Sequence, residues 1–291
     1  MPTVDLATRD IERHARRASE RAVREASPWI EALGRFGHAA IGLVYATIGM
    51  LAAQAALGRG GGTTDSQGAL AWLVQRPHGH ALLVALAVGL AGYAAWRAVE
   101  AILDTDSKGS DAKGIAARLA YAGFGATYAA LALSALRLGL QWGDGDGGGG
   151  DASAQDWTAW LLSQPFGQVL VVVAGLGVVG VGLFQFYLAY TEKFCDHLRM
   201  AEISGSQQRQ VRAVGRVGYA ARGVAFAIIG MLLAAAGLHA RPEEARGLGG
   251  ALTTLAEQPF GPWLLGAVAV GLVAYGAFML VQARYRRIVI R

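Results

Sequence analysis

The residue of this chain best suited to chemistry is Arg222, a cation inside the apolar run Val217–Leu238. It lies six residues past Arg216, which is about 9 Å further along a helix that rises 1.5 Å per residue. An arginine at the centre of a membrane helix costs about 2.5–3.5 kcal/mol on insertion scales. Two explanations stay open. The side chain extends back to the membrane surface, or it pairs with an anion such as the carboxylate of Glu100 or Glu192.

The sequence carries no signature of an enzyme or of a metal site. It contains no Ser/His/Asp signature, no H-E-x-x-H and no phosphate-binding loop. Cys195 is the only cysteine, which excludes an intramolecular disulfide and a thiolate metal site and leaves an isolated thiol at the membrane interface. His78 and His80 form an H-x-H pair without a third ligand nearby. We therefore expect a protein that is not an enzyme, with no catalytic residue, no cofactor and no resident metal.

A stretch rich in glycine and aspartate, "GDGDGG" from Gly143, formally matches G-x-G-x-x-G. The dinucleotide fingerprint needs a strand before it and a helix after it, whereas this stretch follows an apolar run. Asp144, Asp146 and Asp151 could gather a calcium ion. However, Gln155 stands where the twelve-residue calcium loop needs its closing glutamate. We expect a flexible acidic linker.

Long apolar runs in the sequence predict membrane helices. Of the 291 residues, 54% are hydrophobic and 16% are charged, against about 25% charged in an ordinary soluble domain. A membrane helix needs about 20 mostly apolar residues, and six runs are long enough. They are Phe36–Leu57, Ala81–Val99, Ile115–Leu136, Gln168–Tyr190, Val217–Leu238 and Pro262–Val281. The sequence predicts an all-α integral membrane protein with six transmembrane helices and the lipid bilayer as its main partner.

Basic residues predict the orientation of these helices. Arginines and lysines gather before the first run, in the second and fourth connections and at the end of the chain, while the other three connections carry few. By the positive-inside rule, both termini and the basic connections are cytoplasmic. We expect a multi-pass protein of the plasma membrane. Its net charge of +5 follows from this orientation, and we expect no nucleic-acid partner.

The chain also repeats itself. The phrase "QPFG" occurs at Gln164–Gly167 and again at Gln258–Gly261, and "RPHG" stands at Arg76–Gly79. Each phrase precedes a long apolar run. Upstream, the units open with "GRFGHAAIGLVY" from Gly34, "ARLAYAGFGATY" from Ala117 and "GRVGYAARGVAF" from Gly215.

Aligning these phrases superposes residues from all three units. The sets are Arg35, Arg118 and Arg216; Gly42, Gly125 and Gly223; Tyr45, Tyr128 and Phe226; Gly89, Gly177 and Gly271; and Tyr93, Val181 and Tyr275. The same alignment sets Arg222 against Ile41 and Phe124, so the scaffold itself needs no cation there. We predict three parallel repeats of two helices each, at 34–104, 117–194 and 215–288.

These phrases resemble the membrane family known as domain of unknown function 1206. The resemblance rests on a G-R-x-G-Y-x-A-x-G-like opening and on Q-P-F-G before a G-L-x-x-Y helix, and it covers Gly34 to about Ile288. The first copy departs from the pattern at His78, and the second departs at Ala117 and Val181. The resemblance implies three tandem two-helix units in a membrane. It implies no catalytic residue, because the family carries no established reaction.

The proline and glycine of each phrase are expected to be structural. Proline in the first turn of a helix loses no hydrogen bond, and it pushes the preceding residue out of helical geometry. Each phrase is predicted to end a short surface helix on the outer side and to begin the next membrane helix. A ligand-binding role is the alternative. The residues concerned are Pro77, Gly79, Pro165, Gly167, Pro259 and Gly261.

Three rings are predicted at mid-depth. Tyr45 lies ten residues beyond Arg35, or about 15 Å deeper. Tyr128 and Phe226 reach the same depth by the repeat alignment. We expect the rings to point between helices, near the centre of the three repeats. Unpaired polar groups in hydrocarbon are costly, so the hydroxyls need partners such as a carbonyl or Thr47.

The segment 1–33 mixes arginines with acidic residues around a weak apolar stripe. It is predicted to form a cytoplasmic amphipathic helix that lies on the bilayer or binds membrane or cytoplasmic proteins. Five tryptophans are expected at the outer membrane boundary, where amphipathic rings favour the headgroup region. They are Trp72, Trp142, Trp157, Trp160 and Trp263.

Two functional hypotheses follow. The first is a non-enzymatic integral membrane protein with a structural or partner-binding role. The alternative is a small-solute or lipid transporter or channel with a site between the repeats. Polar groups that converge at mid-depth favour transport, and an apolar interior favours the first hypothesis.

Overall fold

The computed structural model describes residues 32–103, 112–142, 149–196 and 198–285. The predicted N-terminal helix lies outside the described residues, apart from the last two positions of the segment 1–33. Asp144 and Asp146 also lie outside them. The described chain is helical, as the composition predicted.

Each of the six apolar runs overlaps a helix that is long and apolar enough to cross a membrane. These helices are the first helix (Ala32–Ala56), α3 (Gly79–Leu103), α4 (Ala112–Leu140), α6 (Gly167–Thr191), α7 (Gly205–His239) and α9 (Gly261–Tyr285). The prediction of six membrane-length helices is confirmed. α7 begins 12 residues before the predicted Val217, because a polar first segment continues the helix beyond its apolar part.

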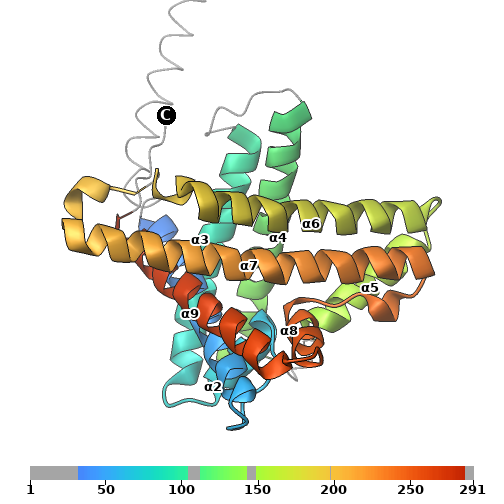
Figure 1. Ribbon diagram of the computed structural model, residues 1–291, viewed down its shortest axis with the longest axis horizontal. Coiled ribbons are helices and arrows are strands. Elements are labelled where there is room, and N and C mark those ends of the chain that lie inside the picture. The colour runs from blue at the N-terminus through green and yellow to red at the C-terminus, as the bar shows by residue number, and fades with distance from the viewer. Residues whose placement is uncertain (1–31, 104–111, 143–148, 197, 286–291) are drawn as a thin grey trace, which may run out of the picture.

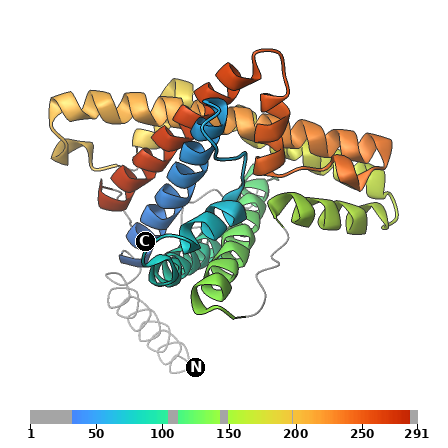
Figure 2. The ribbon, with the colours of Figure 1, turned by 90° about the horizontal axis from the view of Figure 1, so that it is seen from below.

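The long helices pack in pairs. α3 lies along α4, and α6 lies along α7 in a clearly different direction (Figure 1). α9 packs against α7, and the first helix lies between α9 and α3 (Figure 2). Glycines allow the close approach: a Cβ added to Gly230 would lie 2.5 Å from the backbone nitrogen of Val179. Small residues at helix contacts are the usual packing solution in membranes.

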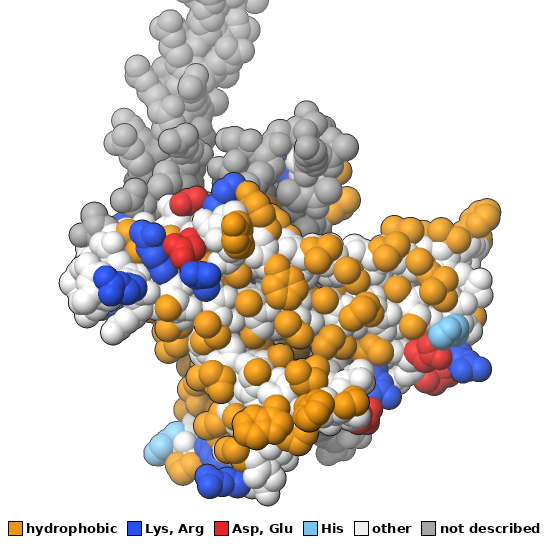
Figure 3. Space-filling view, viewed as in Figure 1, with side chains coloured by type: hydrophobic (Ala, Val, Ile, Leu, Met, Phe, Trp, Pro, Cys, Tyr) orange, Lys and Arg blue, Asp and Glu red, His pale blue; other side chains and the backbone are white. Residues whose placement is uncertain are grey.

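The outer surface of the helix pairs is apolar. Hydrophobic side chains cover the face formed by α6 and α7, and charged side chains gather toward its two ends (Figure 3). An extended apolar face with charged borders suits hydrocarbon better than water. Four of the five tryptophans are more than half exposed: Trp142, Trp157, Trp160 and Trp263.

Each P-x-G phrase forms the same turn between a short helix and a long one. The short helices α2 (Ser66–Val74), α5 (Gly150–Leu162) and α8 (Leu248–Ala256) precede the turns, and α3, α6 and α9 begin at the glycines. In the second copy, the backbone nitrogen of Gly167 donates to the carbonyl oxygen of Gln164 at 2.9 Å. Phe166, between them, has a left-handed φ of 62°. His78 and Phe260 share this conformation, with φ of 60° and 63°.

The prolines therefore lie at the second position of a β-turn. The prediction that they lie in the first turn of the following helix was wrong. The fixed φ of Pro165 suits that turn position as well as it suits a helix start. Gly167 has a separate reason to be glycine, because a Cβ there would overlap the carbonyl oxygen of Leu161. Local chemistry thus explains why the phrase is repeated.

The N-termini of the three short helices meet at one end of the molecule, which we call the short-helix end. The carboxylate of Asp65, the N-cap of α2, accepts a hydrogen bond from the backbone nitrogen of Gly150 at the start of α5. Asp151 accepts bonds from two backbone nitrogens at the start of α8, at 2.7 and 3.2 Å. The hydroxyl oxygens of Thr63 and Thr253 lie 2.7 Å apart. Asp151 is thus part of a helix cap and not of a flexible linker, because helix N-termini attract carboxylates.

Candidate functional site

Arg222 lies at the midpoint of α7, 17 residues from Gly205 and 17 from His239. Only 8% of its surface is exposed. The side chain therefore does not extend back to the membrane surface, contrary to the first explanation offered for it. Its surroundings are aromatic rings from other helices.

Two helices besides α7 contribute rings around the guanidinium group. Nη1 of Arg222 donates a hydrogen bond to the hydroxyl oxygen of Tyr275 on α9. The guanidinium carbon lies 4.6 Å from the centre of that ring, 5.0 Å from Phe226 and 5.3 Å from Tyr45. Ring faces attract cations at such distances, with about 0.5–2 kcal/mol for each contact.

Tyr128 on α4 brings in the second repeat. Its hydroxyl lies within electrostatic range of Tyr45 and Arg222, and its ring stands edge-on to Tyr93 at 4.8 Å. Tyr45 and Tyr275 form a similar edge-on pair at 4.9 Å. We call the following residues the Arg222 cluster: Arg222, Tyr45, Tyr128, Phe226 and Tyr275. The three rings that the repeat alignment superposes therefore lie together between the helices.

Arg222 holds a charge that nothing in the described chain neutralises. Its Nε is buried without a hydrogen-bond partner, and no salt bridge within the described residues reaches the side chain. Moving a charge out of water costs several kcal/mol, roughly, unless an opposite charge compensates it. Phenols and ring faces recover part of this cost. The cluster therefore retains an attraction for an anion.

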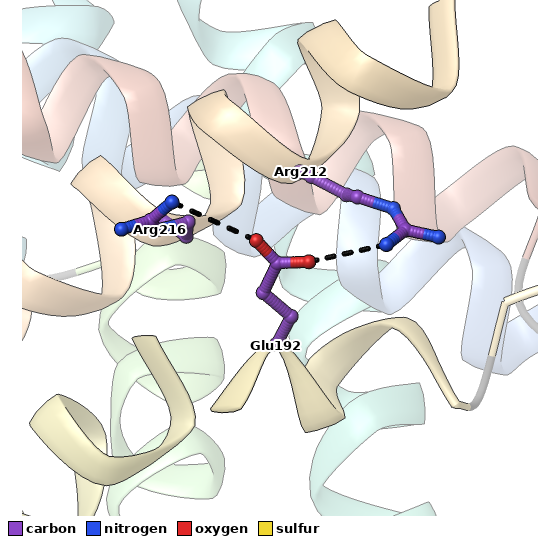
Figure 4. Close-up of polar contacts among 3 residues, drawn as sticks. All are labelled: Glu192, Arg212 and Arg216. Atoms are coloured by element: carbon purple, nitrogen blue, oxygen red, sulfur yellow. Dashed lines mark hydrogen bonds and ion pairs between the residues drawn. The ribbon is translucent and has the colours of Figure 1, made fainter. Parts of the chain in front are cut away.

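Glu192, one of the two carboxylates predicted to pair with Arg222, has other partners. Its Oε2 lies 3.3 Å from Nη1 of Arg212, and its Oε1 lies 3.8 Å from Nη1 of Arg216 (Figure 4). Glu192 is the C-cap of α6 and stands beside the early turns of α7, several residues short of Arg222. The predicted pair with Arg222 is therefore not formed. The side chain of Glu100 lies outside the described residues.

A second arginine–phenol pair lies within α3. The hydroxyl of Tyr93 accepts a hydrogen bond from Nε of Arg97 at 2.8 Å, as that of Tyr275 accepts one from Arg222. Tyr93 and Tyr275 are aligned in the repeats. Thr47, the predicted partner of a tyrosine, donates at 2.9 Å to a carbonyl oxygen of its own helix instead.

Sequence reasoning missed His38, which is 2% exposed and stands edge-on to Tyr93 at 5.2 Å. The repeat alignment places His38 against Tyr121 and Tyr219. Tyr219 meets Tyr275 edge-on at 5.5 Å in the same way. This recurrence was the signal in the sequence that could have identified His38.

The end of the bundle opposite the short helices is closed by aromatic rings. Phe194 in η1 (Lys193–Cys195) stacks on Tyr219 at 5.0 Å and meets Phe278 edge-on at 5.0 Å. Phe194 is 3% exposed and Phe278 is fully buried. Cys195 beside them is also buried, and this burial raises the pKa of its thiol to about 11.

The remaining predicted sites show no ligand chemistry in the described part of the chain. No group of three His, Cys, Asp or Glu side chains there could hold a metal ion. Nε2 of His80 lies 3.1 Å from the side-chain nitrogen of Gln141. His78 forms the left-handed position of its turn. The two histidines thus have separate surroundings.

Comparison with known proteins places this chain in a family. The family described as Domain of Unknown Function (DUF1206) matches three tandem segments, residues 36–104, 119–192 and 217–286. An uncharacterized protein of Bacillus subtilis (strain 168), YxxB, is 35% identical over 263 residues, which are 90% of this chain and 94% of that relative. No solved structure matches the chain. The chain therefore belongs to the DUF1206 family and contains three tandem matches to its domain.

Proposed function

We propose that this protein is a non-enzymatic protein of the plasma membrane, in which three parallel repeats surround a binding site for a small anion. The site is the Arg222 cluster. Carrier function is the role that fits such a site best, since transporters built from parallel repeats bind their substrates between the repeats. The bilayer supplies the surroundings in which a buried cation attracts an anion strongly.

The observation that carries this proposal is the uncompensated charge of Arg222. Ile41 and Phe124 occupy the aligned positions, so the same scaffold forms around apolar side chains. A purely structural or partner-binding role, which the sequence favoured, does not explain why a cation that is costly to bury stands at this position. A ligand carboxylate or phosphate would accept hydrogen bonds from the free Nε and from nearby tyrosine hydroxyls.

In the proposed orientation, the short-helix end faces outward and both termini are cytoplasmic. Arg212 and Arg216 lie at the opposite end, beside Glu192. That placement agrees with the positive-inside rule. A reporter fused after either terminus should then read cytoplasmic, and one inserted at Gly147 should read external.

Anion binding can be measured as stabilisation of the full-length protein. The protein would be purified in a neutral detergent and unfolded thermally with increasing acetate, phosphate or chloride at constant ionic strength. A ligand present at 100 times its Kd stabilises the native state by about 2.7 kcal/mol. We expect one of these anions to raise the Tm of the wild type and to have no effect on Arg222→Ile.

Arg216→Gln is the matched control, because it removes a cation from the same helix outside the cluster. Its response to anions should equal that of the wild type. If no anion stabilises the wild type, or if Arg222→Ile responds as the wild type does, the anion site is refuted.

A further inference from the structure

An apolar groove runs between α3 and α4 on an exposed side of this helix pair. Its volume is about 730 Å³, and alanines provide most of its lining. On α3 it extends from Ala87 to Ile102, which is about 22 Å of helix at 1.5 Å per residue. One leaflet of a bilayer has a hydrocarbon layer about 15 Å thick, so this space, which we call the α3–α4 groove, is long enough for one lipid chain.

The helix pair of α6 and α7, which the repeat alignment superposes on α3 and α4, shows what fills the same space elsewhere. A Cβ added to Gly223 of α7 would lie 3.1 Å from the ring of Phe186 on α6. The alignment sets Gly125 of α4 against Gly223 and Ala98 of α3 against Phe186. A Cβ added to Gly125 would lie no closer than 3.4 Å to any atom of α3. A ring thus covers the glycine in one pair, and the α3–α4 groove lies over it in the other.

The alanines of α3 are not required for packing the long helices. Ala98, which lines the groove, is aligned with Phe186 of α6 and Leu280 of α9, and Ala95 is aligned with Leu183 of α6. α6 and α9 both pack against α7 with these larger side chains in place. The groove is therefore about one side chain deep. A helix of a second copy, about 10–12 Å across, is too wide for such a space, whereas a hydrocarbon chain fits it.

Arg118 of α4 stands at one end of the α3–α4 groove. Its Nε donates to the carbonyl oxygen of Ala101 at 2.7 Å, and its Nη2 donates to that of Ile102 at 3.0 Å. Both of these residues line the groove. Arg118 is only partly buried, and no carboxylate in the described part of the chain forms an ion pair with it. Its counterpart in the third repeat, Arg216, does lie beside a carboxylate, that of Glu192.

We propose that the α3–α4 groove binds one anionic phospholipid, with a hydrocarbon chain along the alanines and the phosphate at Arg118. A guanidinium group matches the geometry of phosphate oxygens, and basic pockets between membrane helices bind lipid head groups on the cytoplasmic side. In the orientation proposed above, the Arg118 end is cytoplasmic. The end of α3 and the start of α4 project beyond α6, and Ile102 there is 70% exposed (Figure 1). Lipid can therefore reach this end of the groove.

The lipid site is separate from the Arg222 cluster. Tyr93 of α3 and Tyr128 of α4 are buried on the inner side of the pair, whereas Val88 and Leu133 of the groove are about half exposed. Binding of a lipid in the groove and binding of a small anion at Arg222 can therefore be tested independently of each other.

The test measures lipid binding to the full-length protein in a neutral detergent by native mass spectrometry, with phosphatidylglycerol and phosphatidylcholine of the same chains as probes. One phosphatidylglycerol should bind at least tenfold more tightly than phosphatidylcholine, and inorganic phosphate should not displace it. The variant Ala95→Leu/Ala98→Phe gives α3 the side chains that α6 carries at the aligned positions. It should weaken phosphatidylglycerol binding at least tenfold without lowering the Tm.

Ala130→Phe is the matched control for the filled groove, because it adds the same ring to an exposed position of α4 outside the lining. It should bind phosphatidylglycerol as the wild type does. Arg118→Gln should remove the preference for phosphatidylglycerol, and Arg118→Lys, which keeps the charge, should retain most of it. Arg137→Gln removes a cation from the other end of α4 and should retain the preference in full.

Equal affinities of the wild type for the two lipids would overturn the proposal. It would also be overturned if phosphatidylglycerol binding survived in the filled groove, if Ala130→Phe weakened it as much, or if Arg118→Gln kept the preference. Displacement by inorganic phosphate would show that the chain contributes nothing and would overturn the lipid site. Conversion of a dimer to a monomer by the filled groove, with lipid binding intact, would assign the groove to a second copy instead. If the filled variant does not fold, the comparison of Arg118→Gln with Arg118→Lys decides.

Discussion

Two arginines on one helix, Arg216 and Arg222, lie six residues apart and differ in almost every physical respect. Arg216 has a side chain that is 58% exposed and faces the carboxylate of Glu192. Arg222 is 8% exposed and contacts a phenol and three ring faces. The first needs no partner, because water solvates it. The second stays in the interior without an opposite charge among the described residues, and this difference is the basis of the proposed anion site.

The largest stability effect is expected for Tyr275→Phe, which deletes the hydroxyl that accepts a hydrogen bond from Arg222. A buried donor left without its partner costs about 1–3 kcal/mol, and more for a charged group. The free energy of unfolding in detergent should fall by at least this amount. Tyr190→Phe, at a residue that is 85% exposed, is the control and should change it little. Equal effects of the two variants would show that the bond to Arg222 contributes nothing.

A smaller effect is expected for Glu192→Gln, which breaks the pairs with Arg212 and Arg216. Exposed ion pairs contribute up to about 1 kcal/mol, and salt screens them. The loss of stability should therefore shrink between about 0.1 M and about 1 M salt. The loss from Tyr275→Phe should not change with salt. A loss of stability in Glu192→Gln that does not change with salt would show that salt screens its ion pairs no more than it screens the buried contact of Arg222.

The helices and turns could be predicted because their causes are local. Apolar run length sets the six spans, and the turn geometry of Pro165 and Gly167 depends on a few neighbouring residues. The predicted position of the proline was wrong by two residues, since a fixed φ suits both a turn and a helix start. Helix ends outside the apolar runs, such as that of α7, could not be located by hydropathy.

The site was predicted less completely, because its contacts are tertiary. The inward position of Tyr45 followed from spacing and repeat alignment, whereas the burial of Arg222 was only one of two open explanations. Its partner did not follow, because Tyr275 lies 53 residues away in the sequence and a carboxylate is the ordinary partner for an arginine. The exposure of Gly123 and Gly177 was also beyond prediction, because both glycines fit the repeat pattern and that pattern alone implies a closed pair.

The smallest expected effect on stability concerns Cys195, which lies at the same end of the bundle as Glu192. Burial raises the pKa of its thiol to about 11. The folded state thus favours the neutral thiol. The resulting stabilisation is complete below the unfolded pKa of about 9 and is lost as the pH rises through about 11. Alkylation by iodoacetamide should be slow at pH 8 and accelerate toward pH 11, with free cysteine as the reference. A rate at pH 8 equal to that of free cysteine would contradict the burial.

Whether Arg222 serves a ligand or the fold is tested by the double variant Arg222→Ile/Tyr275→Phe, measured for both stability and anion response. It gives α7 the side chain that the first repeat carries at Ile41 and removes the hydroxyl left without its donor. Apolar replacement of a buried charge together with its partner is often neutral or stabilising, so the free energy of unfolding should stay within about 1 kcal/mol of the wild type or rise. Stabilisation by anions should disappear. A loss of about 3 kcal/mol or more, the range seen when one partner of a buried pair is removed, would show that Arg222 serves the fold and not a ligand.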